Sequence, residues 1–175
     1  MIARRALKVS AALLLSLGLT VLTVNANVFA GPSPKDAEKY TNQLKTSKDP
    51  KQKVDALNEL GKLGQIQKAL VTPALESIMK ALEDKEATVR AAAAKCLGMI
   101  DPDPKEAVPA LLKLVKDDKE ESVRIAAMQG LGSMGPNAKE ASKSLKDIAK
   151  QEKADKKSKL GKAAGNALKS INPKP

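Results

Sequence analysis

The chain has 175 residues, a formal net charge of +11, no histidine, no tryptophan, one cysteine and an aromatic content of only 1%. The absence of histidine excludes catalytic dyads and triads that use an imidazole base, and a single cysteine can make neither an internal disulfide nor a zinc site. A hydrophobic content of 42% with almost no rings favours thin layers of closely packed helices over a β-sandwich. Carboxylates and lysines remain, so catalysis is not excluded, but no pattern supports it. We predict an all-α, non-catalytic protein without cofactor or metal, and no small-molecule substrate is evident.

Residues 1–30 have the pattern of a secretory signal peptide. Three positive charges in the first eight residues precede a 15-residue apolar run at residues 10–24. Small side chains at Val28 and Ala30 then occupy the −3 and −1 positions of a cleavage site before Gly31. Because the apolar run is short for a membrane span, we expect a cleaved signal and a mature protein outside the cytoplasm, periplasmic or secreted.

The alternative to cleavage is an uncleaved membrane anchor over residues 7–30. Cleavage would leave 28 Lys and Arg residues against 20 Asp and Glu residues, a net charge of +8. We expect residues 31–35 to form a linker, residues 36–171 to form one domain, and residues 172–175 to form a tail.

The domain is built from copies of one pattern, 34 to 37 residues apart. Residues 87–98 recur at residues 121–132, and both copies contain Val-Arg-x-Ala-Ala and end in Leu-Gly. A copy ending at Gly61 and a degenerate copy ending at Lys169 flank them. We therefore predict four repeats of two helices each, over residues 36–64, 66–100, 102–135 and 136–171.

Apolar positions recur when the copies are stacked. They form an alanine column, a leucine column four residues later and a third column four residues before the alanines. This spacing places all three columns on one face of the second helix, which we predict to be buried. The columns contain Ala56, Ala93, Ala127 and Ala164; Leu60, Leu97, Leu131 and Leu168; and Gln52, Val89, Val123 and Leu160.

Prolines and glycines predict the helix ends. Pro73 and Pro109 fit the first turn of a helix, where the missing N–H costs nothing. Gly98, Gly132 and Gly135 fit the end of a helix, where a residue in the left-handed conformation closes it.

The motif Pro-x-Leu…Asp…Val-Arg-x-Ala-Ala…Leu-Gly resembles the HEAT-repeat family, particularly its short bacterial form. The resemblance implies a short right-handed α-solenoid of about four helix pairs. It also implies a structural ladder between repeats, in which an Asp between the two helices pairs with an Arg of the second helix. Here Asp84 with Arg90, and Asp117 with Arg124, match that pattern.

A second set of positions stays polar in every copy. In HEAT-like proteins the second helix of each repeat lines the concave face, so these residues would form a polar strip there that could bind a partner. The alternative is that they are simply the solvated side of an amphipathic helix. The strip contains Asn58, Lys95, Gln129 and Asn166.

These features predict an exported scaffold or adaptor that holds a protein partner on the concave face of a solenoid. The alternative is a basic protein that binds nucleic acid or another polyanion, because the mature charge is positive and the last repeat is rich in lysine. Against nucleic acid, Tyr40 is the only aromatic residue of the mature chain, and export would separate the protein from the genome. The lysine-rich last repeat could still contact an anionic partner. We expect Cys96 to be a partly buried structural thiol.

Overall fold

The computed structural model of the protein describes residues 31–151 and 158–173, so the predicted signal peptide lies outside the described residues. All regular structure in these ranges is helical, as the sequence predicts. The first helices of the four repeats are α1 (Pro34–Thr46), α4 (Leu75–Ala81), α6 (Pro104–Asp117) and α8 (Ser142–Gln151). The second helices are α2 (Pro50–Ile66), α5 (Ala87–Ile100), α7 (Glu121–Ser133) and α9 (Lys159–Ile171). Shorter turns are α3 (Lys68–Val71) and the 3₁₀ segments η2 (Thr72–Ala74) and η3 (Gly135–Ala141).

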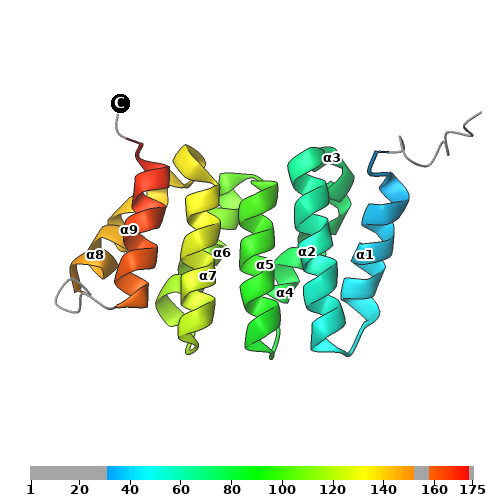
Figure 1. Cartoon of the computed structure of the whole chain (residues 1–175), viewed down its shortest axis with the longest axis horizontal. Coiled ribbons are helices and arrows are strands. Elements are labelled where there is room, and N and C mark those ends of the chain that lie inside the picture. The colour runs from blue at the N-terminus through cyan, green and yellow to red at the C-terminus, as the bar shows by residue number, and fades with distance from the viewer. Residues whose placement is uncertain (1–30, 152–157, 174–175) are drawn as a thin grey trace, which may run out of the picture. The chain divides into compact units, whose positions relative to one another are not determined.

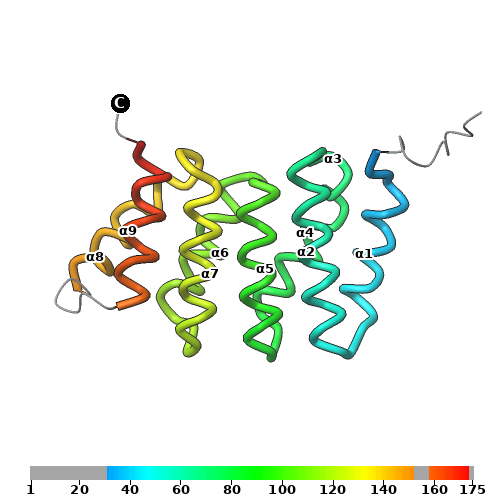
Figure 2. The backbone as a smooth tube through the Cα atoms, in the orientation of Figure 1, coloured from blue at the N-terminus to red at the C-terminus, as the bar shows by residue number. Residues whose placement is uncertain are grey.

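The second helices stand side by side in one row, and α4, α6 and α8 lie behind that row (Figures 1 and 2). The most extensive helix–helix contacts join α2 to α5, α5 to α7 and α7 to α9. Each second helix therefore packs mainly against the second helix of the next repeat. This arrangement is an α-solenoid, as predicted.

Side-chain caps set where several helices begin. Ser33 and Asp36 form a reciprocal capping box in which the Ser33 N–H donates to Asp36 at 2.9 Å and the Asp36 N–H donates to Ser33 Oγ at 3.4 Å. This box starts α1 at Pro34, inside the expected linker. Asp49 and Asp103 cap α2 and α6 in a simpler way, each accepting a backbone N–H at 2.9 Å and each followed by proline.

The predicted buried columns are largely confirmed. All four alanines of the alanine column, and the leucines of the first three repeats, have no exposed surface. The exceptions lie in the terminal repeats, where Leu160 and Leu168 are half-buried and Gln52 is exposed. A terminal repeat has a neighbour on one side only, so its outward positions stay in contact with water.

Glycines allow the row of second helices to pack tightly. A Cβ atom on Gly98 of α5 would lie 2.5 Å from the Cα of Gly130 in α7, and one on Gly130 would lie 2.5 Å from the carbonyl oxygen of Ala94. The two helix backbones therefore meet without a side chain between them. The prediction that Gly98 and Gly132 close helices in the left-handed conformation was wrong, because both lie inside helices and contact the next repeat.

Two other residues take the left-handed conformation. Asp101 ends α5 with φ 49°, and Gly135, as predicted, has φ 56° after α7. The carboxylate of Asp101 also accepts a hydrogen bond from the Asn137 amide at 2.7 Å, and its carbonyl oxygen accepts one from the Lys68 ammonium. Asp101 thus connects the segments that follow three successive second helices, α2, α5 and α7.

The two prolines behave differently. Pro73 lies in η2, directly before α4, which agrees with a position at the start of a helix. The same prediction was wrong for Pro109, which lies inside α6. Asp103 and Pro104 start α6 earlier, so Pro109 falls in the second turn and its ring faces solvent.

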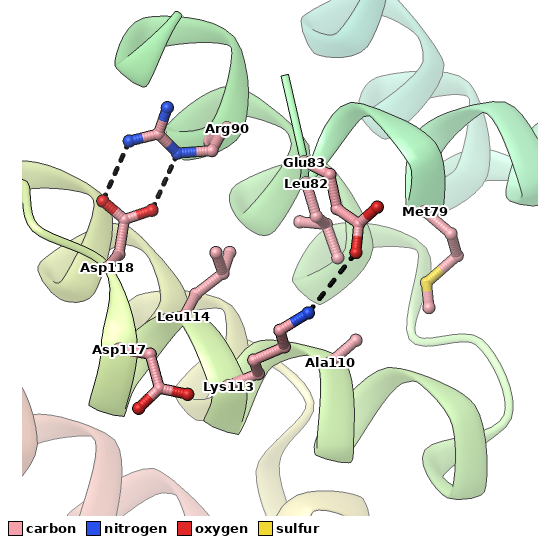
Figure 3. Close-up of a pocket in the computed structure, with 9 residues that line it drawn as sticks. All are labelled: Met79, Leu82, Glu83, Arg90, Ala110, Lys113, Leu114, Asp117 and Asp118. Atoms are coloured by element: carbon pink, nitrogen blue, oxygen red, sulfur yellow. Dashed lines mark hydrogen bonds and ion pairs between the residues drawn. The ribbon is translucent and has the colours of Figure 1, made fainter. Parts of the chain in front are cut away.

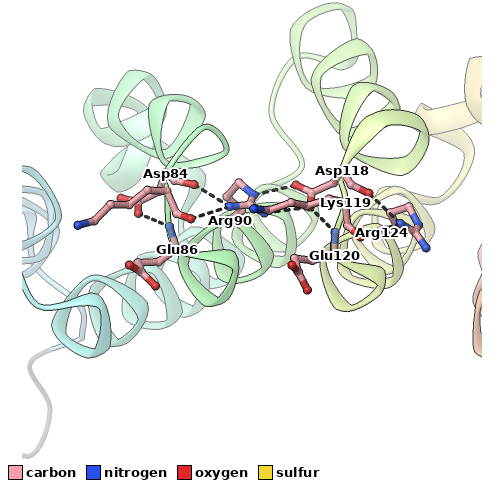
Figure 4. A network of polar contacts seen from close by, with 8 residues as sticks. Asp84, Glu86, Arg90, Asp118, Lys119, Glu120 and Arg124 are labelled. Carbon is pink, nitrogen blue, oxygen red and sulfur yellow. Dashed lines mark hydrogen bonds and ion pairs between the residues drawn. The ribbon is translucent and has the colours of Figure 1, made fainter.

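A ladder of ion pairs runs along the beginnings of the second helices (Figure 4). Arg90 donates two hydrogen bonds to the carboxylate of Asp118, from Nε at 2.7 Å and from Nη2 at 2.9 Å. Its Nη1 donates to the carbonyl oxygens of Asp84 and Lys85 at 2.9 and 3.1 Å. The Asp118 side chain is only 5% exposed. The second and third repeats are therefore joined by a bidentate, partly desolvated pair.

The ladder joins successive repeats, but the expected pairs are not formed. Arg90 binds the carboxylate of Asp118 in the next repeat and only the carbonyl oxygen of Asp84. Asp117 was wrong by one residue, because the carboxylate in the ladder belongs to Asp118. Asp84 lies six residues before Arg90, and Asp118 lies six residues before Arg124, whereas Asp117 lies seven before it. Arg124 does not bind this carboxylate but donates to the carbonyl oxygens of Asp118 and Lys119. The equal six-residue spacing was a signal in the sequence that could have identified Asp118 as the ladder residue.

The ion pair between the first and second repeats contains a lysine in place of an arginine. Lys53 of the first repeat donates to the carboxylate of Asp84 at 2.6 Å, so the first and second repeats are also joined. Burial opposes ionisation of Asp84, but the hydrogen bonds from Lys53 and the Glu86 N–H outweigh it and lower its pKa. The hydrogen bonds from Arg90 likewise hold the pKa of Asp118 below its usual value, and Asp118 in turn raises the pKa of Arg90.

The glycine contact predicts opposite effects for two Gly→Ala substitutions. Gly98→Ala should lower the free energy of unfolding by about 1–3 kcal/mol, because the new methyl group forces two backbones apart. Gly165→Ala in α9 is the matched control. It places its methyl group in open space, and it should stabilise the fold by about 0.5–1 kcal/mol because alanine favours a helix. Urea unfolding followed by circular dichroism measures both, and equal effects would contradict the assigned contact.

The ladder predicts that the two neighbouring aspartates differ in importance. Asp118→Asn should destabilise the protein by about 2 kcal/mol near neutral pH, since a charge-assisted pair is lost. Asp117→Asn should change stability by less than about 0.5 kcal/mol, because Asp117 is exposed.

The stabilisation from Asp118 should also depend on pH. Because the pKa of Asp118 is lower in the folded chain, its contribution is complete above the unfolded-state value of about 4 and is lost as the pH falls through the folded-state value. The stability gap between wild type and Asp118→Asn should therefore close in acid. A gap that does not narrow as the pH falls below about 4 would show that the carboxylate charge is not its cause.

Candidate protein-interaction surface

The structure places the four residues of the polar strip on one surface. Asn58, Lys95, Gln129 and Asn166 are all exposed, and they lie on α2, α5, α7 and α9, which stand side by side (Figure 1). Two residues before each of them, the alanine column is fully buried. Each second helix therefore presents its strip residue on the side away from the core.

Exposed residues three, four or seven positions from the strip share its side of each helix. We call this surface the second-helix face. Its exposed members are Lys51, Asp55, Asn58, Lys62, Gln65, Thr88, Lys95, Ser122, Gln129, Ser133, Lys159, Lys162, Asn166, Lys169 and Ser170.

A groove lies on this face between α7 and α9. It has a volume of about 290 Å³ and is lined by Gln129, Gly132 and Ser133 on α7 and by Ala163, Asn166, Ala167 and Ser170 on α9. Two of the strip residues, Gln129 and Asn166, thus line one groove, whereas Asn58 and Lys95 lie on the neighbouring helices. Gly132 and Ala167 lie close together between the two helices. Because their side chains are small, they leave the groove open.

Two further grooves lie between the first helices, and neither was predicted from the repeat pattern. The groove between α4 and α6 also has a volume of about 290 Å³, with an apolar lining that includes Met79, Leu82, Ala110 and Leu114 (Figure 3). An exposed ion pair between Lys113 and Glu83, 3.4 Å long, crosses it. The groove between α1 and α4 is larger, about 540 Å³, and is lined by Lys45, Lys53, Glu76, Lys80 and Asp84 among others.

Both grooves lie beside α4, which is a short helix. It has 7 residues, since its repeat is divided into α3, η2 and α4, whereas α6 has 14. The repeat pattern does not reveal how the first part of a repeat is divided. The ladder residues at these grooves, Arg90 and Lys53, are already paired with Asp118 and Asp84.

Cys96 belongs to the core. It is 1% exposed, and burial raises the pKa of its thiol to about 12, so the thiol stays protonated. Within the described ranges, acidic and thiol side chains do not gather in a group of three that could hold a metal ion. None of the described helices is long and apolar enough to cross a membrane.

Comparison with known proteins agrees with this geometry. A family model for HEAT repeats matches residues 75–165, more than half of the chain. A comparison with curated proteins finds no match.

Among solved structures, two engineered proteins from the Northeast Structural Genomics Consortium share the fold. Each is 24% identical to this chain, and each match covers 78% of this chain, with TM-scores of 0.60 and 0.57. The chain spans 62% of the first protein and 37% of the second. The repeat pattern, the row of second helices and the match to the family model lead to one conclusion: the chain belongs to the HEAT-repeat family.

Proposed function

We propose that the protein is an exported, non-catalytic scaffold or adaptor that binds a protein partner on the second-helix face. The observation that carries this proposal is the row of exposed polar residues on four neighbouring helices, two of which line a groove. HEAT repeats commonly mediate protein interaction, and stacked repeats provide extended binding surfaces.

The strip residues are available for binding because the fold does not use their side chains. In the part of the chain that the structure describes, no hydrogen bond or ion pair within the protein involves the side chains of Asn58, Lys95, Gln129 or Asn166. The polar side chains of the ladder, in contrast, are committed to joining repeats. Polar groups that stabilise nothing in the free protein can be given to a partner at little cost in stability.

Export is supported by the charged start, the apolar run and the small residues of the first 30 residues. We expect the intact mass of the protein from an extracytoplasmic fraction to match a chain that begins at Gly31. A full-length chain recovered from membranes would show an anchor instead. A full-length chain in the cytoplasm would contradict export and favour the polyanion-binding alternative.

A strip variant tests the binding surface. We expect the triple variant Lys95→Glu, Gln129→Ala and Asn166→Ala to capture at least about tenfold less of the specific partner than wild type, while its helicity and melting temperature stay unchanged. A triple variant of the first helices, Lys105→Glu, Lys116→Ala and Lys143→Ala, is the control and should retain the partner. Quantitative mass spectrometry of affinity-captured proteins, repeated with the purified partner, measures both. Equal losses in the two variants would contradict the proposed surface.

A further inference from the structure

Charge is distributed unevenly over the second-helix face. Its charged members are six lysines and one aspartate: Lys51, Lys62, Lys95, Lys159, Lys162, Lys169 and Asp55. Lys62 is paired with Glu59 at 2.6 Å. Within the described part of the chain, no carboxylate lies within ion-pair distance of the other five lysines. The face therefore carries uncompensated positive charge.

The first helices have a more even mixture of charges, with ten exposed lysines and six exposed acidic residues, whereas the second-helix face has six lysines and one aspartate. Acidic side chains are interspersed with lysines along them, at Asp36, Glu38, Glu76, Glu106, Asp117 and Asp147. The positive net charge of the chain therefore does not by itself explain why acidic residues are nearly absent from the second-helix face. A mixed surface is the ordinary arrangement for a soluble protein, and a surface of one sign attracts ligands of the opposite sign.

The groove between α7 and α9 lies within this positive surface. Lys159, Lys162 and Lys169 share the side of α9 that carries Asn166, because they lie seven, four and three residues from it. Lys95 belongs to α5, and α7 stands between α5 and α9 (Figure 1). The groove itself is lined by neutral groups, the amides of Gln129 and Asn166 and the hydroxyls of Ser133 and Ser170. Cations thus flank a neutral centre that can form hydrogen bonds.

A side-chain amide both donates and accepts hydrogen bonds, which matches the alternating N–H and C=O groups of an extended main chain. The small residues Gly132, Ala163 and Ala167 at the base of the groove let another backbone approach closely. Lysines on both sides then suit carboxylate side chains that project from such a segment. Both the hydrogen-bonding groups and the charges therefore fit an acidic peptide in an extended conformation.

The same face lacks the side chains that recognise nucleic acids. Proteins that bind single strands or read bases use arginine and aromatic side chains. The arginines of the described residues, Arg90 and Arg124, both serve the ladder. Tyr40 lies on α1, where the ammonium of Lys39 is 5.0 Å from its ring centre. Lysines pair with phosphates as well as with carboxylates, so what this surface lacks is the means to stack on bases or to read them.

We propose that the groove between α7 and α9 binds an extended, acidic segment of a protein partner. The main chain of the segment hydrogen-bonds to Gln129 and Asn166, and its Asp or Glu side chains face Lys95, Lys159, Lys162 and Lys169. This inference rests on the proposed function and specifies the chemistry of the partner.

The test uses two fluorescent 12-residue peptides, one of alternating Glu and Gly and one with Gln in place of each Glu. Fluorescence anisotropy with the full chain should show binding of the Glu peptide only, weakened at least about tenfold between 50 and 300 mM NaCl because salt screens the charges. The double variant Lys162→Glu and Lys169→Glu should bind at least about tenfold more weakly than wild type. The matched control, Lys143→Glu and Lys146→Glu in α8, changes the net charge equally on the other side of the same repeat and should stay within about threefold.

A third variant, Gln129→Ala with Asn166→Ala, keeps every charge and should still weaken binding about three- to tenfold, because the main-chain hydrogen bonds are lost. Circular dichroism checks that each variant folds. Equal losses in the α9 and α8 variants would overturn the inference, since they would show unspecific attraction to a basic repeat. Tighter binding of a 12-nucleotide single-stranded DNA, with the same dependence on α9, would overturn it in favour of nucleic acid.

The two proposals fail in different ways. If the captured partner depends on the strip but neither acidic peptide nor DNA binds, the second-helix face remains the binding surface and only the acidic character of the partner is wrong. If the acidic peptide binds in the groove and no partner is captured through the strip, the site exists but the scaffold function is contradicted.

Discussion

The backbones of α5 and α7 meet at Gly98 and Gly130 without an intervening side chain, and the rest of the domain depends on this close approach. Two helices can pack so tightly only where neither has a Cβ atom, so the distance between the second and third repeats is set at this point. Alanines in the buried column continue the same close packing along the row. A core made of such small side chains is thin, which explains how the domain forms almost without aromatic residues.

Tight packing holds the second helices together, and polar contacts set their alignment. Dispersion and burial of apolar surface have little directional preference, so they do not by themselves prevent one helix from sliding along another. The pairs Lys53–Asp84 and Arg90–Asp118 hold the beginnings of the second helices in step. Asp101, with Lys68 and Asn137, performs the same function near their other ends. The row is thus aligned at both ends, and its exposed side remains free for a partner.

Much of this fold could be predicted from the sequence, because its repeats are short and nearly regular. Equivalent positions in successive copies have equivalent surroundings. The prediction that the alanines and leucines of the inner repeats are buried was therefore correct. The wrong predictions concern residues whose type or position fits two different structural roles. Gly98 and Gly132 were read as helix ends because glycine suits both a left-handed residue and a close helix contact, and only the three-dimensional packing separates the two. Asp117 and Asp118 are adjacent carboxylates that differ only in which one reaches Arg90. The grooves beside α4 could not be foreseen, because nothing in the pattern shows that one first helix is broken and its counterpart continuous.

The burial of Cys96 has a consequence for the fate of the chain in an oxidising environment. Disulfide exchange requires a thiolate that can reach another sulfur atom, and in the folded protein this thiol is both protonated and covered. In the native chain Cys96 is therefore protected from disulfide exchange. Separation of the second helices around Cys96 would expose the thiol and permit a disulfide with a second chain. The tight packing of the second helices thus also protects the protein from forming a disulfide through Cys96.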